Sequence, residues 1–349
     1  MESKNILILG YFGHITNQLD GQTIKTRNIY TLLKTKYSND KVYWFDTQEL
    51  QSRKSSYFKL VRKLLQCDVL VYLPGQNNLK KFGPIIHYLK LIKSFEIIHI
   101  AVGGWLYDFL CTNNQYSKYL SEYKAVLIEN KPVIENIRHD FNKINALYIP
   151  NFRIHDFTPS FPPERSSSKT NLNIVFMARI SMAKGIDVLF RIASKIKMNS
   201  VINQKINIDF FGPIQTNDDK AYLHNQIMQI PFADYKGILS PDEIYLNLSK
   251  YDVLILPTRY HGEGFPGSIV DAYISGIPVI VSNWKHLPEF VEHGKTGFIF
   301  DSEEELFEQI ITLLSDRHLL SQMKRNAYEK SKEYSHEVAW DILKPYIEK

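Results

Sequence analysis

The stretch DVLILPTRYHGEGFPGSIVDAYISGIPVIVS, residues 252–282, decides the fold class. The apolar runs at 252–257 and 278–282 predict two buried β-strands. Between them, a loop containing glycines and a proline leads into a short helical pattern, which we expect Gly276 and Pro278 to end. A strand, a helix and a second strand in this order predict a βαβ unit, and therefore a parallel sheet covered by helices.

The same alternation runs along the rest of the chain. Residues 151–171 interrupt it, because they combine prolines with a serine run and show no apolar period, which predicts a linker. We therefore expect two doubly wound, Rossmann-like α/β domains at 1–150 and 172–334, and a final helix at 335–349 that could dock on either. The other expected strands lie at 5–9, 42–45, 68–73, 96–102, 124–129, 145–149, 173–178, 206–211 and 297–300, and the clearest helices at 22–36, 54–66, 79–93, 130–142 and 184–198.

Composition narrows the classes of function. The net charge is +5, and residues 1–150 hold 20 Lys and Arg against 12 Asp and Glu. This bias indicates either an ordinary solvated surface or an anionic partner such as a sugar phosphate or a lipid. A nucleic acid is not expected as a partner, because no aromatic stacking motif accompanies the cations. The apolar runs are too short for a transmembrane helix, and the first residues do not resemble a signal peptide. The two cysteines match no metal spacing and favour a reduced, cytoplasmic setting.

The residues that follow the expected strands carry the candidate chemistry, because ligands of doubly wound sheets bind at the carboxyl ends of strands. Arg179 and Lys184 follow the strand at 173–178 and precede a helix. Two cations at the positive end of a helix suit a diphosphate, whereas either one alone is also consistent with a surface cation. We expect this edge to face a cleft between the two domains.

Two acids flank the glycines of the loop after residue 257. Glu263 lies in the loop, where it is either a partner of sugar hydroxyls or a solvated acid. Asp271 lies eight residues later, and is either a hydroxyl acceptor or the acid of a capping box with Ser268 as N-cap. No metal-ligand spacing accompanies these acids, so we expect no protein-bound metal.

Three further features leave alternatives open. Gly21 lies in the first loop, GYFGHITNQLDGQTIKTRN (10–28), which lacks the G-x-G-x-x-G pattern of nicotinamide enzymes. This glycine is either a phosphate-facing or a plain turn glycine. His99 lies within an apolar run and is expected to be a core residue. The segment SRKSSYFKLVRKLL (52–65) predicts a basic amphipathic helix, which either lies on an anionic membrane or covers its own domain, with an apolar face made of Phe58, Val61, Leu64 and Leu65.

Two motifs carry a resemblance to a known family. FMARISMAKG (176–185) and YKGILSPDEIYLNLSKYDVLILPTRYHGEGFPGSIVDAYISGIPVIVS (235–282) resemble the donor-site motifs of the retaining GT-B glycosyltransferases, which use nucleotide sugars and carry a Glu–seven residues–Glu motif. The resemblance covers nearly the whole chain and is densest from 173 to 300. It implies an acceptor domain first, a donor domain second, and a final helix that crosses back onto the first domain.

The resemblance also implies roles by position. Arg179 and Lys184 would hold the donor diphosphate and Glu263 would lie at the donor sugar, so these three are the expected catalytic residues. Asp271, where the family usually has Glu, would bind the ribose hydroxyls. The family's cleft histidine has no clear counterpart in AVGGWL (101–106). The other expected donor-binding residues are Gly21 facing the phosphates, Gly237 and Ile238 beside the base, and Gly264, Phe265, Pro266 and Gly267 around the sugar and phosphate.

The expected function is retaining transfer of a hexosyl or N-acetylhexosaminyl group from a UDP- or GDP-sugar to a saccharide or lipid-linked saccharide, in polysaccharide biosynthesis. No cofactor or metal is expected. The expected location is cytoplasmic, with an anionic membrane surface at the inner face of the plasma membrane as a further candidate partner. The alternatives are a GT-B-type nucleotide-sugar epimerase or sugar phosphorylase, and a nucleotide-sugar-binding protein without chemistry.

Overall fold

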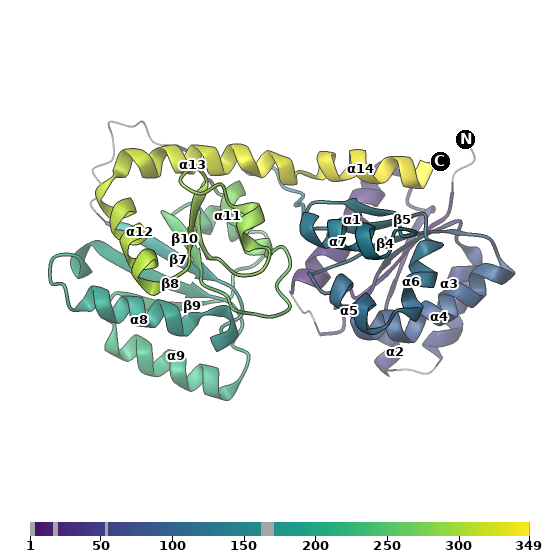
Figure 1. Ribbon diagram of the computed structural model, residues 1–349, viewed down its shortest axis with the longest axis horizontal. Helices are drawn as coiled ribbons and strands as arrows, with labels where there is room; N and C mark the ends of the chain where they lie inside the picture. Colours follow the sequence, from purple (N-terminus) through teal and green to yellow (C-terminus); the bar gives the residue numbers. More distant parts are fainter. Residues whose placement is uncertain (1–3, 17–19, 53–54, 162–170, 349) are drawn as a thin grey trace. The chain divides into compact units, whose positions relative to one another are not determined.

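The computed structural model describes residues 4–16, 20–52, 55–161 and 171–348, which form two compact units (Figure 1). Unit 1 comprises Met1–Ile154 and Tyr334–Lys349, and unit 2 comprises His155–Glu333. Each unit contains a parallel six-stranded sheet covered by helices. The expectation of two doubly wound α/β domains is confirmed.

The sheet of unit 1 has the strand order β2-β1-β3-β4-β5-β6. In β1, Ile6 and Ile8 join the core on one face of the sheet, while Leu7 and Leu9 join the core on the other. Because both faces are covered, the strands must be apolar throughout, which is why short continuous apolar runs predicted them. The strands are β1 Ile6–Gly10, β2 Val42–Asp46, β3 Val69–Leu73, β4 Glu96–Ile100, β5 Ala125–Ile128 and β6 Ala146–Tyr148.

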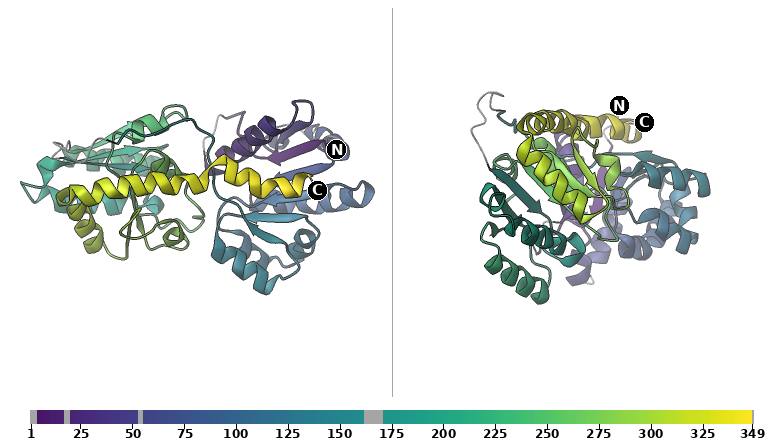
Figure 2. Two further views of the ribbon diagram at one scale, coloured as in Figure 1. Left: turned by 90° about the horizontal axis from the view of Figure 1, so that it is seen from above. Right: turned by 60° about the vertical axis from the view of Figure 1, so that its left-hand side comes forward.

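Two groups of helices cover this sheet, and Figure 2 shows them from two further sides. Residues of α1 (Gly21–Lys36) and α14 (His336–Glu348) share one core, so the final helix packs on unit 1. The opposite core takes residues from the helices between β2 and β6. The remaining helices are α2 Glu49–Ser52, α3 Ser56–Gln66, α4 Gln76–Ile92, α5 Leu106–Thr112, α6 Gln115–Ser121 and α7 Lys131–Asp140.

The apolar face expected for the helix at 52–65 is wrong. Leu60 and Leu64 pack in the core, whereas Phe58 is 83% exposed and Leu65 is 40% exposed. The buried residues of α3 are spaced four apart from Ser56, so its outer face carries both apolar and basic side chains. Residues 53 and 54, which supplied two of the expected cations, lie outside the described residues.

Unit 2 has the strand order β12-β11-β10-β7-β8-β9. Strand β9 was not expected, because its sequence ADYKG is largely polar; it lies at the edge of the sheet and is only partly buried. The strands are β7 Leu172–Met177, β8 Ile206–Phe211, β9 Ala233–Gly237, β10 Val253–Leu256, β11 Val279–Ser282 and β12 Gly297–Phe300.

The helices of unit 2 lie on both sides of its sheet. In Figure 1, α8 and α9 lie along one side and α11 and α13 along the other. A single turn of 3-10 helix, Met182–Lys184, connects β7 to α8. The helices are α8 Ile186–Lys197, α9 Asn217–Gln229, α10 Ile244–Leu248, α11 Gly267–Ile274, α12 Glu303–Ser315 and α13 Arg317–Ser331.

Candidate active site

Strand pairing brings the two predicted motifs of unit 2 together. Strands β7 and β10 are parallel neighbours, with Val253 paired to Ile174 and Leu254 to Val175. Parallel neighbours end at the same edge of a sheet, so the loop that follows Met177 and the loop that follows Leu256 emerge side by side. The candidate site therefore forms at this carboxyl edge, from segments about 80 residues apart in the sequence.

Lys184 and Glu263 form a buried ion pair at this edge. The Lys184 Nζ atom lies 2.8 Å from Oε1 and 2.7 Å from Oε2 of Glu263, and the two residues are only 9% and 6% exposed. The Thr258 hydroxyl donates a further hydrogen bond of 2.7 Å to Glu263 Oε2. Burying two charges is costly unless they are paired and hydrogen-bonded, and both conditions are met here.

The ring of Tyr260 lies next to both predicted cations, Arg179 and Lys184. The Arg179 guanidinium carbon lies 5.1 Å from the centre of the Tyr260 ring, and Lys184 Nζ lies 4.9 Å from it. A cation is attracted to the face of an aromatic ring at such distances. Arg179, Lys184 and Glu263, the three expected catalytic residues, are thus gathered around one tyrosine, which the sequence analysis did not single out.

Gly185 allows the lysine loop to approach β10 closely. Its φ of +84° is in the left-handed region, and a Cβ atom there would lie 2.0 Å from the carbonyl oxygen of Pro257. Only glycine fits both the conformation and the space. This contact places Lys184 beside the loop that carries Glu263.

Replacing Gly185 by alanine should lower the free energy of unfolding by more than about 2 kcal/mol, because two backbone segments must move apart. Gly237 provides a matched control: its φ is +83°, but no described atom lies within 4 Å of the position that its Cβ would take. Gly237→Ala should therefore cost only about 1 kcal/mol, the conformational penalty alone. Urea denaturation measures both, and equal losses would contradict the close-approach argument.

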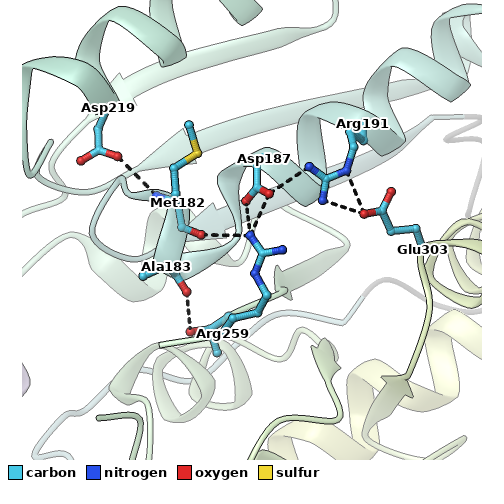
Figure 3. Close-up of polar contacts among 8 residues, drawn as sticks. Met182, Ala183, Asp187, Arg191, Asp219, Arg259 and Glu303 are labelled. Atoms are coloured by element: carbon cyan, nitrogen blue, oxygen red, sulfur yellow. Dashed lines mark hydrogen bonds and ion pairs between the residues drawn. The ribbon is translucent and has the colours of Figure 1, made fainter. Parts of the chain in front are cut away.

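A second network anchors the lysine loop (Figure 3). Arg259 donates from Nη2 to both carboxylate oxygens of Asp187, at 2.7 and 2.8 Å, and its backbone N–H donates to the carbonyl of Ala183. Arg191 bridges Asp187 and Glu303. Burial alone would raise the pKa of Asp187, but the hydrogen bonds from Arg259 and Arg191 outweigh it and hold that pKa below its usual value. The loop between β7 and α8 is therefore held by the loop after β10.

The glycine loop after Glu263 is more buried than the sequence suggested. Gly264, Phe265 and Pro266 are buried, and the Phe265 ring stacks on Phe290 with the ring centres 3.7 Å apart. The side chain of Phe265 is therefore part of the protein core. The role predicted for the backbone amides of this loop stays a prediction.

The capping box proposed for Ser268 and Asp271 is wrong. Helix α11 begins at Gly267 with Pro266 as N-cap, and within the described residues no side-chain hydrogen bond caps it. Asp271 lies one turn inside the helix and is 5% exposed. The cap alternative is therefore removed, and ribose binding by Asp271 stays a prediction.

The remaining predicted residues lie at two different edges. Gly237 ends β9, and its carbonyl accepts a hydrogen bond from Gly212 N, so it lies at the carboxyl edge of the unit 2 sheet; Ile238 follows it and is 60% exposed. Gly21 is the first residue of α1 in unit 1, where Asp20 and Thr23 form a capping box. Gly21 belongs to unit 1 and the cluster around Lys184 to unit 2, so the role predicted for Gly21 stays a prediction.

His99 is a core residue, as expected. It is completely buried in β4, next to the rings of Tyr72 and Tyr123, and neither ring nitrogen has a hydrogen-bond partner among the described residues. Burial lowers the pKa of its imidazole from 6.5 to about 3. The side chain is therefore neutral in the folded protein at physiological pH.

This burial predicts a pH dependence of stability. Between pH 6.5 and about 3 the unfolded state binds a proton at His99 that the folded state does not. The free energy of unfolding should therefore fall by about 1.4 kcal/mol for each unit by which the pH drops in this window. His99→Phe should remove that part of the slope, whereas a change at the exposed His139, such as His139→Asn, should keep it; urea denaturation at several pH values measures this. An unchanged slope in His99→Phe would show that this group does not carry it.

Thr258, Tyr260 and Arg259 contact the site and were not predicted. All three belong to the stretch TRY (258–260), which begins the loop after residue 257. Polar and aromatic residues directly after a buried strand are a signal that could have found them.

The described residues contain neither a metal-binding cluster nor a membrane-spanning helix. No group of three or more His, Cys, Asp or Glu side chains there could hold a metal ion. No helix in the described part of the chain has the length and apolarity needed to cross a membrane.

Two doubly wound parallel α/β units, one with a charged cluster at its carboxyl edge, define a GT-B-like protein, and comparison with solved structures agrees. The Anabaena protein Alr3699/HepE, whose structure was solved in complex with UDP-glucose, matches with a TM-score of 0.75 at 16% identity, over 99% of both chains. Sucrose-phosphate synthase from Thermosynechococcus elongatus matches with a TM-score of 0.74 at 14% identity, over 99% of this chain and 98% of its own. At such identities the likeness establishes the fold.

Sequence comparison adds a family match and curated relatives. Residues 158–330 match the family "Glycosyl transferases group 1". The capsular polysaccharide biosynthesis glycosyltransferase CapM of Staphylococcus aureus is 28% identical over 180 residues, which is 50% of this chain and 45% of CapM.

A second relative comes from Campylobacter jejuni. Its N,N'-diacetylbacillosaminyl-diphospho-undecaprenol alpha-1,3-N-acetylgalactosaminyltransferase is 24% identical over 240 residues, which is 66% of this chain and 61% of the relative. The chain thus spans about half the length of the curated relatives that it matches.

Proposed function

We propose that this chain transfers a hexosyl or N-acetylhexosaminyl group from a nucleotide-diphosphate sugar to a saccharide or lipid-linked saccharide. The configuration at the anomeric carbon is retained, and no protein-bound metal takes part. One observation carries the proposal: Arg179, Lys184 and Glu263 lie around Tyr260 at the carboxyl edge of a domain that matches glycosyltransferase group 1.

The hydrogen-bond capacity of the ion pair suits a phosphate ligand. A lysine ammonium has three N–H donors, and Lys184 directs two of them to the oxygens of Glu263. The third is free to reach a phosphate oxygen of the donor. Arg179, which is half-buried beside the Tyr260 ring, adds a planar group that can bind two phosphate oxygens at once.

These cations would act on the leaving group. Glycosyl transfer breaks the bond between the anomeric carbon and the diphosphate oxygen, so negative charge grows on the diphosphate and positive charge on the sugar in the transition state. Fixed cations at the diphosphate stabilise this state more than the bound substrate. Because Gly185 and Arg259 hold the lysine loop in place, little reorganisation is needed when the charge develops.

Glu263 has two proposed tasks. Its contacts with Lys184 and Thr258 fix the position of the ammonium group. The carboxylate has lone pairs beyond those three hydrogen bonds, and we assign them to a hydroxyl of the donor sugar. Asp271 and Gly237 with Ile238 are assigned to the ribose and the base, and Gly21 of unit 1 to the phosphates.

The comparisons supply candidate substrates. HepE was crystallised with UDP-glucose, which makes UDP-sugars the first donors to test. The name of the C. jejuni relative describes transfer to a diphospho-undecaprenol-linked sugar, which supports a lipid-linked acceptor. We assign acceptor binding to unit 1.

The test is to incubate the protein with UDP- and GDP-sugars, with and without lipid-linked saccharides, and to follow release of the nucleoside diphosphate. We expect acceptor-dependent release, a product with retained anomeric configuration by NMR, and unchanged activity in EDTA. An epimer formed from donor alone would identify an epimerase. Formation of a sugar phosphate that depends on added phosphate would identify a phosphorylase. Tight binding without turnover would identify an inert binding protein, inversion would contradict retention, and loss of activity in EDTA would contradict metal independence.

A further inference from the structure

Helix α4 of unit 1 has an exposed apolar stripe. Ile85, Tyr88, Leu91 and Ile92 are 37%, 63%, 72% and 78% exposed. Positions three and four apart lie on one face of a helix, so these residues form a single stripe along the second half of α4. Single exposed apolar residues are common on protein surfaces, but a contiguous patch of this kind marks an interaction site.

The stripe is not needed for the core of unit 1. The opposite side of the same helix already packs in the core, through Leu79, Phe82 and Ile86. An amphipathic helix that covers a sheet normally turns polar residues outward. Helix α4 is therefore apolar on both sides.

The neighbouring helix α3 extends the surface. Helices α3 and α4 contact each other on the same face of the sheet, and α3 exposes Phe58 and Leu65. Leu65 lines a hollow of about 770 Å³ together with Lys93, which follows the last residue of α4. We call the exposed residues Phe58, Arg62, Leu65, Tyr88, Leu91 and Ile92 the α3–α4 surface.

The charge of this region is mostly positive. Neither α3 nor α4 contains Asp or Glu, and residues 50–95 hold nine Lys and Arg but one acid, Asp68. Unit 1 as a whole has 23 Lys and Arg against 15 Asp and Glu, whereas unit 2 has 19 against 22. The hollow beside Leu65 is lined by two acids, Asp40 and Asp68, and by four of these cations, namely Lys59, Arg62, Lys63 and Lys93.

We propose that the α3–α4 surface lies on an anionic lipid bilayer. The apolar side chains enter the boundary between headgroups and acyl chains, and the surrounding cations contact lipid phosphates. Two copies of this chain would not pair through the surface, because cations would face cations. The proposal rests on unit 1 alone and does not depend on the glycosyl transfer proposed for unit 2.

The choice of variants follows from the contacts. Lys63 is only partly exposed and donates to the carbonyl of Trp44, so reversing its charge would disturb the fold. Leu91 and Ile92 protrude from the surface and can be changed without opening the core. Met228 in α9 of unit 2 is 85% exposed and provides a matched control for an exposed apolar residue replaced by an acid.

The experiment is co-sedimentation with vesicles of phosphatidylcholine that contain about one third phosphatidylglycerol, and with vesicles of phosphatidylcholine alone. We expect the wild-type chain to bind the anionic vesicles, and more weakly at high salt. The double variant Leu91→Glu/Ile92→Glu should lower the partition coefficient by about tenfold or more. Met228→Glu should bind like the wild type, and Arg62→Glu should bind about fivefold more weakly. Unchanged thermal unfolding of the variants separates loss of binding from loss of fold.

Four outcomes would overturn the proposal. The first is that the wild-type chain stays in the supernatant, and the second is that the double variant binds the vesicles as well as Met228→Glu does. The third is that binding is equal for anionic and neutral vesicles. The fourth is that the wild-type chain forms a dimer, the double variant is a monomer and neither binds vesicles, which would identify the surface as a contact between copies.

Discussion

Lys184→Ala is expected to lower kcat by about 10²–10³. The reason is that Lys184 supplies one of the two cations that we place at the leaving diphosphate, and its effect is larger in the transition state than in the bound substrate. Arg179→Ala should lower kcat by a similar factor, since both cations lie next to the ring of Tyr260. Steady-state kinetics with a saturating donor measures both.

The matched control is Lys205→Ala, which removes an exposed lysine from the same unit and should leave kcat unchanged. Arg179 is the cleaner of the two site variants, because Lys184→Ala also leaves the buried Glu263 without its main partner. A kcat near the wild-type value in Arg179→Ala, in a folded protein, would remove that residue from the diphosphate site.

Glu263→Ala is expected to destabilise unit 2 by about 3–5 kcal/mol. The change leaves the ammonium of Lys184 buried without a counter-charge and removes the acceptor of the Thr258 hydroxyl. Lys184→Met alone should also be costly, because it leaves the carboxylate unpaired. Urea denaturation followed by fluorescence measures these free energies.

The double variant Glu263→Ala/Lys184→Met separates pairing from packing. If the two charges stabilise each other, the loss in the double variant is smaller than the sum of the two single losses. Strictly additive losses would mean that the two side chains do not interact in solution. The control is Glu329→Ala, which removes an exposed acid from α13 and should change stability by less than about 0.5 kcal/mol.

The apolar runs of the sequence were sufficient to predict the two sheets, because strands covered on both faces must be apolar throughout. Strand β9 was missed since an edge strand such as ADYKG needs no such run.

Periodicity misassigned α3 for a related reason. It placed Phe58 and Leu65 on one apolar face with Leu64, although the structure buries Leu64 and exposes the other two. A sequence pattern does not distinguish an apolar residue that packs in the core from one that meets another surface.

The residue types of the site were readable from the sequence, but their pairing was not. Arg179, Lys184 and Glu263 were each predicted from their place after a strand, with Lys184 assigned to phosphate and Glu263 to sugar. The direct contact of Lys184 with Glu263 depends on β7 and β10 being neighbours in the sheet, and the order of strands in the sequence does not determine this. The capping box failed because the N-cap of α11 is Pro266, two residues before the serine that was chosen as N-cap.

The most direct test of the central claim is calorimetric titration of the protein with UDP and with GDP. If Arg179 and Lys184 form a diphosphate site, at least one of the two nucleotides binds, Arg179→Ala weakens that binding about tenfold or more, and Lys205→Ala does not. A folded wild-type protein that binds neither nucleotide would contradict the account, as would binding that is unchanged by Arg179→Ala.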